Sequence, residues 1–218
     1  MKKEKFHKDT FDNTTSIRRK KVLDEAIAEF ACKGYHATSI NEIARNANIS
    51  IGAMYSYFAS KEDLFLSIVN DAYDLMNEIL QKIGNESKDV FDCIRKMIAA
   101  SRFFALEYPQ LNQIYLDITT QALSSLSVRL SSKLEIMTPH LLGEQLRNAK
   151  EAGLIESGLD EKIMAYCIDN IFMMYQFSFS SDYYKQRLCI YLEIEEPGDM
   201  EQIEADIYSF ICYGIRKK

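Results

Sequence analysis

Glycine and proline are scarce in this chain of 218 residues, which contains 8 Gly and 3 Pro. Long stretches carry neither residue, which argues against a many-stranded β protein and favours helices. No run of about 18 apolar residues is present, so we expect no membrane span. The N-terminus carries lysines without a following apolar stretch, so we expect no secretory signal and a cytoplasmic protein.

Metal-binding and disulfide patterns are also missing. The five cysteines are scattered and form no Cys-x-x-Cys pair, which argues against a disulfide framework or a zinc site. We expect small buried side chains in a reducing compartment, with a redox-sensing cysteine as the alternative. The three histidines (His7, His36 and His140) lie far apart in the sequence, so we expect no metal ligand set.

Catalytic motifs are absent as well. The sequence has no nucleophile elbow, no phosphate-binding glycine loop, no His-Glu-x-x-His and no paired-carboxylate motif. We therefore expect a protein that is not an enzyme and needs no cofactor.

Charge is divided unevenly along the chain, whose net charge is −6. Residues 1–61 hold 11 Lys and Arg against 7 Asp and Glu, a balance of +4, whereas residues 62–218 hold 15 against 25, a balance of −10. A basic head on an acidic body is typical of a protein that contacts nucleic acid at one end.

Apolar periodicity predicts an all-α protein of about nine to ten helices. Residues 1–15 lack periodicity and are predicted to be a disordered basic arm. A helix should begin near Ser16 and end at Gly34, and a long one should run from Ser60 to Gly84. Ser39 and Glu42 form a capping-box pattern at the start of a short helix. Further helices are expected at 87–107, 110–120, 121–151 with a break or kink at Pro139, 160–180, 182–192 and 199–216.

Residues 16–62 have the plan of a helix-turn-helix DNA-binding domain. Two short helices, one opened by Ser39 and one by Ser50, are joined by a tight turn and follow a longer helix. Gly52 and Ala53 follow Ser50, where a helix that enters the major groove needs small residues. The rest, 63–218, is predicted to be a larger helical effector-binding and dimerisation domain.

Two stretches make the prediction more specific: Gly34-Tyr35-His36-Ala37-Thr38-Ser39-Ile40-Asn41-Glu42-Ile43-Ala44 and Ile49-Ser50-Ile51-Gly52-Ala53-Met54-Tyr55-Ser56-Tyr57-Phe58-Ala59-Ser60-Lys61-Glu62-Asp63-Leu64. Together they resemble the DNA-binding signature of the TetR family of bacterial transcriptional regulators, and the match runs without gaps from about Arg18 to Val69. The resemblance implies a DNA-binding transcriptional regulator, with repression as the default mode and activation as the alternative.

The resemblance also implies which side chains contact DNA. Hydroxyls and free amides at a helix start suit a phosphate, and the phenols and a lysine suit the DNA backbone. The sequence departs from the family at Ile51 and Ala53, which offer contact to a thymine methyl but no bidentate hydrogen bond. The expected DNA-binding residues are Thr38, Ser39, Arg45, Ser50, Ile51, Gly52, Ala53, Tyr55, Ser56, Tyr57 and Lys61.

Residues 163–179 carry apolar side chains almost all round, and the last helix has one apolar stripe, so a monomer would expose much of both. In the family the last two long helices form a dimer interface. A dimer would place two recognition helices to read a palindromic operator. The expected interface residues are Ile163, Ile171, Tyr175, Ile203, Ile207, Phe210 and Ile211.

Aromatic and methionine side chains in the second domain suit a small, largely apolar or aromatic effector. Core packing is the alternative for each of them. The expected ligand-binding residues are Phe103, Phe104, Tyr115, Met137, Asn170, Met174 and Phe177. A protein of this shape that works through protein partners or DNA architecture, without an effector, is a second alternative.

Overall fold

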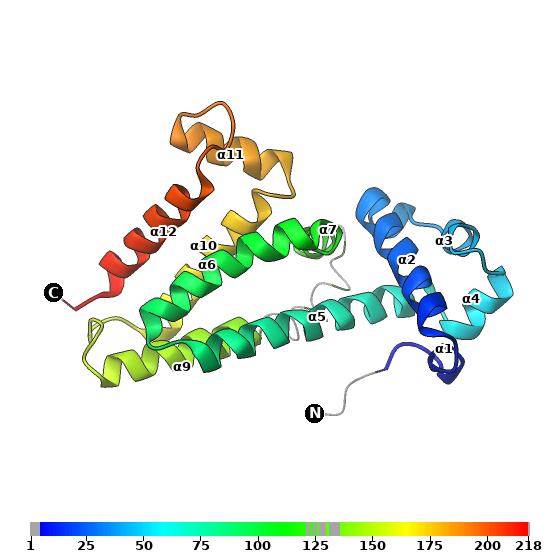
Figure 1. The fold of residues 1–218 in the computed structure, drawn as a ribbon, viewed down its shortest axis with the longest axis horizontal. Helices are drawn as coiled ribbons and strands as arrows, with labels where there is room; N and C mark the ends of the chain where they lie inside the picture. Colours follow the sequence, from blue (N-terminus) through cyan, green and yellow to red (C-terminus); the bar gives the residue numbers. More distant parts are fainter. Residues whose placement is uncertain (1–4, 121–122, 124–125, 127–129, 131–135, 218) are drawn as a thin grey trace. The chain divides into compact units, whose positions relative to one another are not determined.

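The computed structural model describes the chain except for residues 1–4, 121–122, 124–125, 127–129, 131–135 and 218 (Figure 1). The described residues form an all-α protein, as the sequence predicts. The helices are α1 (Asp9–Asp12), α2 (Ser16–Ala37), α3 (Ile40–Asn46), α4 (Ile51–Tyr57), α5 (Lys61–Glu86), α6 (Val90–Glu107), α7 (Pro109–Ile118), α9 (Met137–Glu151), α10 (Glu161–Phe177), α11 (Asp182–Leu192) and α12 (Met200–Ile215).

The helices group into two compact units. The first comprises Met1–Leu75 with Gln113–Ser127, and the second Met76–Asn112 with Val128–Lys218. Helices α5 and α7 therefore contribute residues to both units. Among the described residues, no helix is long and apolar enough to cross a membrane.

The core of the first unit is aromatic. Phe30 of α2 lies edge-on to Phe65 of α5, with ring centroids 5.0 Å apart, and both side chains are buried. Ile43 and Met54 are buried as well, and they lie on the two short helices that the sequence predicts. Helix α3 packs against both α2 and α4. This arrangement is the compact support that a helix-turn-helix domain needs.

Gly34 interrupts α2 near its end, where φ is +71° and ψ is 168°. L-residues with a side chain rarely adopt this conformation, so glycine is required here. The prediction that the helical pattern stops at Gly34 is confirmed, although one further helical turn follows and reaches Ala37.

The core of the second unit is built from α5, α6, α9, α10 and α12. Buried side chains from all five helices form one apolar cluster, to which α10 contributes Met164, Ala165, Ile168, Phe172 and Tyr175. Helix α10 packs closely against α9 and α6, so it is the central helix of this unit. The last described residues are held as well, because Ile155 and Arg216 form an antiparallel bridge.

The N-terminal segment differs from its prediction. Residues 1–4 lie outside the described part of the chain, but Asp9–Asp12 form helix α1, and Phe11 is buried. The prediction of disorder rests on the polar, charged composition of the segment and its lack of periodicity. Phe11 anchors the segment in the first unit, and the prediction of a disordered arm is wrong for the described residues from Lys5 onward.

Pro139 lies in the first turn of α9, which begins at Met137. Proline lacks the amide hydrogen that the first turn of a helix leaves unpaired, so it is tolerated there. Pro139 therefore marks a helix start rather than a kink. Much of the helix predicted for 121–136 lies outside the described residues.

Candidate nucleic-acid interface and ligand groove

Helix α4 has one buried face and one exposed face. Ser50 caps its start, because the Ser50 Oγ accepts a hydrogen bond from the Ala53 amide at 3.0 Å. Met54 and Tyr57 are buried in the first unit. On the other side, Ile51 is 47% exposed and Tyr55 48% exposed. The buried side chains therefore fix α4 to the first unit, while Ile51 and Tyr55 on its opposite face are exposed to solvent.

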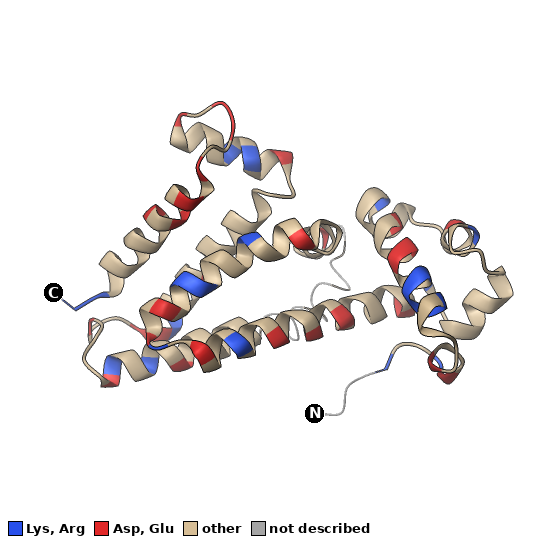
Figure 2. Ribbon diagram, in the orientation of Figure 1, with Lys and Arg blue, Asp and Glu red and all other residues tan. Residues whose placement is uncertain are grey.

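No residue of α4 is charged, as Figure 2 shows by its uniformly tan ribbon. Its exposed surface consists of an isoleucine, a glycine, a tyrosine and serine hydroxyls. Such a surface suits hydrogen bonds and apolar contacts to base edges more than phosphate binding. Any electrostatic attraction to DNA must come from the neighbouring elements.

Most of the expected DNA-binding residues lie at the surface of the first unit. The exposed ones are Arg45, Ser50, Ile51, Gly52, Tyr55 and Ser56, and the partly buried ones are Ser39, Ala53 and Lys61. Thr38 and Tyr57 are buried. The Thr38 hydroxyl donates to the Gly34 carbonyl at 2.7 Å, so it closes the end of α2 instead of facing outward.

Lys61 is bound inside the domain. Its Nζ donates to the carbonyl oxygens of Tyr35 at 2.7 Å, His36 at 3.1 Å and Thr38 at 3.1 Å. It also lies over the Tyr35 ring, 4.7 Å from the centroid. An ammonium group has three hydrogens to donate, and all three are used here. Lys61 thus joins the start of α5 to the end of α2.

The capping box predicted at Ser39 and Glu42 is wrong. Ser39 makes no side-chain cap hydrogen bond, and the Glu42 carboxylate instead pairs with Lys33 at 2.6 Å. Lys33 also pairs with Glu29 at 2.6 Å. These two carboxylates, Glu29 more than Glu42, hold the pKa of Lys33 above its usual range. Lys33 of α2 binds the Glu42 carboxylate, so Glu42 does not cap the start of α3 as predicted.

A basic run that the sequence analysis did not assign to DNA binding opens α2. Arg18, Arg19, Lys20 and Lys21 are consecutive and appear as blue ribbon on α2 in Figure 2. Arg18 and Lys20 are exposed, and Lys20 pairs with Asp24 at 2.8 Å. Four adjacent cations at the start of a helix are unfavourable for the helix dipole. A run of cations that is unfavourable for the helix was the signal in the sequence that these side chains interact with something other than α2.

Residues 22–68 match the family model described as bacterial regulatory proteins, tetR family. Over these residues the chain is similar to the tetR family. The prediction from the two signature stretches is confirmed, and the match covers α3, α4 and most of α2 in the first unit.

Two curated relatives share this tetR-family region. The chain is 49% identical over 57 residues to the uncharacterized HTH-type transcriptional regulator YuxN of Bacillus subtilis (strain 168), which is 26% of this chain and 20% of YuxN. It is 31% identical over 78 residues to IcaR of Staphylococcus aureus (strain Newman), the HTH-type negative transcriptional regulator of the biofilm operon icaADBC. That match covers 36% of this chain and 42% of IcaR. The chain therefore spans less than half the length of these relatives.

Solved structures share the whole fold. A TetR family transcriptional regulator from Chloroflexus aurantiacus is similar with a TM-score of 0.69 at 19% identity, over 98% of this chain and 100% of that one. The transcriptional regulator FadR from Bacillus subtilis, in complex with stearoyl-CoA, has a TM-score of 0.69 at 18% identity, over 90% and 99%. At these identities the likeness shows the fold, and it confirms the TetR-like architecture. All four of these proteins are transcriptional regulators.

The second unit contains a groove of about 380 Å³ between α10, α11 and α12. Its walls are mostly apolar and aromatic, with one guanidinium: Asn170, Ile171, Met174, Tyr175, Ser178, Tyr184, Arg187, Leu188, Tyr191 and Ile207. The Arg187 guanidinium lies over the Tyr191 ring, 4.8 Å from the centroid. The volume of the groove is within the usual range for a small-molecule site.

Of the expected ligand-binding residues, Asn170 and Met174 line this groove. Met137 packs against the core cluster of the second unit, and Phe104 is 4% exposed. Phe177 is buried beside Tyr184, with ring centroids 5.8 Å apart. Phe103 is 50% exposed on α6. The structure therefore does not bring the set together, and α11 contributes groove residues that the sequence analysis did not consider.

Only some of the expected dimer-interface residues are exposed. Ile163 of α10 and Phe210 of α12 are 62% and 72% exposed. Tyr175 and Ile211 are buried, because they face the core of their own unit, and the remaining three pack partly against it. Tyr166 and Tyr213, which lie three residues after Ile163 and Phe210, are 67% and 81% exposed. The helical spacing of three residues was the signal that could have found them.

Proposed function

We propose that this protein is a DNA-binding transcriptional repressor. In this proposal it binds a palindromic operator as a homodimer and is released by a small, largely apolar or aromatic effector. The observation that carries the proposal is the uncharged, exposed face of α4, held from behind by Met54 and Tyr57 within a tetR-family domain. Repression is supported by the name of IcaR, a negative transcriptional regulator.

The proposed contacts to DNA have two parts. Ile51, Tyr55 and Ser56 on the exposed face of α4 would read base edges, while Arg18 and Lys21 of α2 and Arg45 of α3 would bind phosphates. Lys61 and Tyr57, whose polar groups lie inside the domain, would act by holding these surfaces in place. Thr38 would have the same role.

A homodimer is supported by the exposed apolar side chains of α10 and α12. Ile163, Tyr166, Phe210 and Tyr213 are each more than 60% exposed, which is unfavourable for a monomer. Their burial against a second copy would remove apolar surface from water and stabilise the pair. A dimer would also set the spacing between two copies of α4.

An effector is supported by the apolar groove between α10, α11 and α12. FadR, which shares the fold, was solved in complex with stearoyl-CoA. Because α5 supplies residues to both units, a ligand could alter DNA binding through that helix. It would do so only if it bound the two states of the protein with different affinities.

DNA binding is tested by selecting duplexes from a random library and measuring fluorescence anisotropy with the selected sequence. The purified protein should bind an inverted repeat, and Ile51→Ala with Tyr55→Ala should weaken binding about 30-fold or more, since both contacts are lost. Tyr183→Ala is the matched control, because Tyr183 is 69% exposed on α11 in the other unit. Failure to select any sequence would contradict the proposal.

The dimer is tested by sedimentation velocity. Phe210→Glu with Tyr213→Glu should yield a folded monomer, because two charges would be buried in the interface. Ile17→Glu, at an 81% exposed position of α2, should leave the dimer intact. A wild-type monomer would contradict this part of the proposal.

The effector is tested by native mass spectrometry of the purified protein. A dimer with a discrete extra mass would identify a candidate, to be tested for release of the selected DNA. A dimer that retains full DNA affinity in the presence of every apolar compound extracted from the source cells would contradict an effector.

A further inference from the structure

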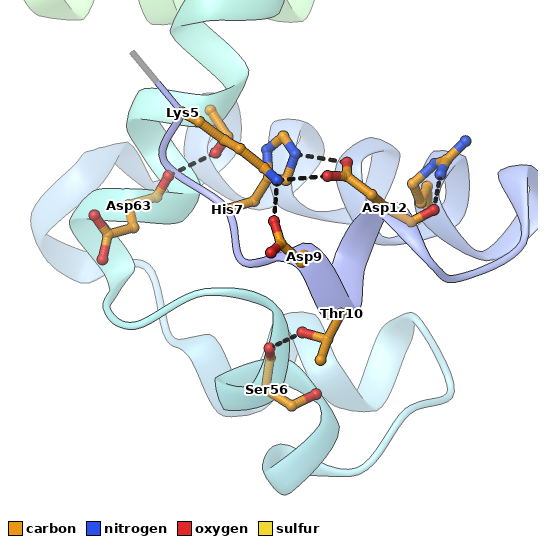
Figure 3. A network of polar contacts seen from close by, with 9 residues as sticks. Lys5, His7, Asp9, Thr10, Asp12, Ser56 and Asp63 are labelled. Carbon is orange, nitrogen blue, oxygen red and sulfur yellow. Dashed lines mark hydrogen bonds and ion pairs between the residues drawn. The ribbon is translucent and has the colours of Figure 1, made fainter.

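The segment from Lys5 to Thr15, here named the N-terminal clamp, contacts the end of α4. Figure 3 shows its polar network, in which Thr10 reaches Ser56 while Lys5 and His7 converge on Asp12. The clamp lies outside residues 22–68, the part of the chain that matches the family model.

The clamp donates hydrogen bonds to the last carbonyl groups of α4. The Lys8 amide donates to the Tyr57 carbonyl at 2.8 Å, and the Lys8 Nζ donates to the Tyr55 carbonyl at 2.8 Å. The Thr10 hydroxyl donates to the carbonyl between them, that of Ser56. The last four carbonyls of any helix lack partners within the helix. Three consecutive ones are therefore capped here by two residues of the clamp.

An apolar contact supports these caps. Phe11 is 3% exposed, and its ring centroid lies 5.3 Å from that of Tyr57 and 4.8 Å from that of Phe58. Helix α4 has only seven residues, and a helix of that length is not stable without tertiary contacts. Phe11 covers the buried side of its last turn.

Ion pairs of Lys5 and a hydrogen bond of His7 join residues within the clamp. Lys5 pairs with Asp9 at 2.5 Å and with Asp12 at 2.6 Å, and His7 pairs with Asp12 at 2.8 Å. Hydrogen bonds from Lys5 and then His7 lower the pKa of the Asp12 carboxyl. The Asp12 carbonyl also accepts from the Arg19 guanidinium, which joins the clamp to the basic run of α2.

We propose that Lys8, Thr10 and Phe11 are positioning residues for DNA recognition: they fix the end of α4 relative to the basic start of α2. This rests on the proposed DNA binding. The clamp holds the surface proposed to read bases at a set place beside the cations proposed to bind phosphates. The Lys8 Nζ donates to the Tyr55 carbonyl of α4, so its effect on DNA is exerted through α4.

Hydrogen exchange of the free protein tests the clamp without DNA. In Lys8→Met with Thr10→Val, the backbone amides of 51–58 should exchange about fivefold to tenfold faster, because two capping hydrogen bonds are lost. Thr10→Ser keeps the hydroxyl and should restore most of the protection when combined with native Lys8. Lys20→Met removes a charge without touching α4 and should not change exchange there. Unchanged exchange in the double variant would overturn the proposal.

DNA titrations separate positioning from general loss of structure. A loosened α4 should lower the ratio of affinity for the selected operator to affinity for random duplex by about fivefold to tenfold, whereas partial unfolding lowers both affinities equally. Thr10→Val alone should leave the salt dependence unchanged, because no phosphate contact is lost. A salt slope that falls by about one in Lys8→Met, with normal exchange, would show Lys8 on a phosphate and overturn the proposal.

The two readouts keep this proposal distinct from the proposed function. If the wild-type protein binds no DNA, the proposed function fails, and with it any role of these residues in recognition. Faster exchange in α4 would then still establish the capping contacts themselves.

Discussion

The side-chain amide of Gln176 in α10 donates to the side-chain oxygen of Asn112 in α7, with 2.6 Å between Nε2 and Oδ1. Asn112 in turn donates to the Gln176 carbonyl at 3.3 Å, and to the Ser180 hydroxyl. Asn112 is 0% exposed and Gln176 is 7% exposed. Two buried side-chain amides thus pair with each other in the second unit, and the Gln176 carbonyl and the Ser180 hydroxyl accept from Asn112 as well.

Gln176→Leu should lower the free energy of unfolding by about 1–3 kcal/mol, because the Asn112 amide loses a partner while remaining buried. Urea denaturation followed by circular dichroism measures this. The double variant Asn112→Leu with Gln176→Leu should cost less than the sum of the single changes, since both polar groups are then removed. Strictly additive effects would contradict the pairing.

Lys61→Met should destabilise the first unit by about 1–2 kcal/mol, because three carbonyl groups at the end of α2 lose their donor. Hydrogen exchange should increase at residues 35–40 before it does elsewhere. Glu62→Gln is a suitable control at the neighbouring position. A variant with native stability but a reduced salt dependence of DNA binding would instead favour the phosphate contact expected from the family resemblance.

Tyr175 should make stability sensitive to alkaline pH. Its hydroxyl donates to Glu204 at 3.0 Å, and burial, followed by the Glu204 charge, raises the pKa of Tyr175 above its usual range. A raised folded pKa means that this contribution is complete below the unfolded value of about 10 and is lost as pH rises beyond it. The stability difference between wild type and Tyr175→Phe should therefore shrink between about pH 9 and 11. A stability difference that stays constant over this pH range would contradict the conclusion that Tyr175 is buried as a neutral phenol.

The cysteines should differ in reactivity. Cys32 and Cys167 are exposed, whereas Cys93, Cys189 and Cys212 are buried. Burial raises the pKa of the Cys93 thiol to about 11, so little thiolate is present at neutral pH. Iodoacetamide followed by peptide mass spectrometry should label the first two and spare the other three until the protein unfolds. Rapid labelling of Cys93 in the native protein would contradict this.

Local signals predicted local structure well. Ser50 caps α4 and Gly34 ends the regular part of α2, because one residue and its backbone decide each event. The chain was also expected to bury its cysteines, which is correct for three and wrong for the exposed Cys32 and Cys167. A helix period alone does not reveal which of its faces a neighbouring helix covers.

Sites built from distant segments could not be predicted in this way. Asn170 and Met174 meet Tyr184 and Arg187 only because α11 turns back beside α10. The capping of α4 by Lys8 and Thr10 depends on where Phe11 packs, which no pattern within residues 1–15 indicates. The carboxylate of Glu42 had two possible partners, and the choice was made by Lys33 from another helix.

The bridge between Ile155 and Arg216 also governs when the second unit can become complete during synthesis. The Glu156 amide donates to the Ile215 carbonyl at 2.9 Å, and the Lys217 amide donates to the Leu154 carbonyl at 3.3 Å. Residues 215–217 are made after nearly every other part of that unit, yet they close the turn between α9 and α10. A nascent chain would therefore leave the apolar surface of α6 that α12 covers exposed to solvent until α12 had left the ribosome, and chaperones would bind there.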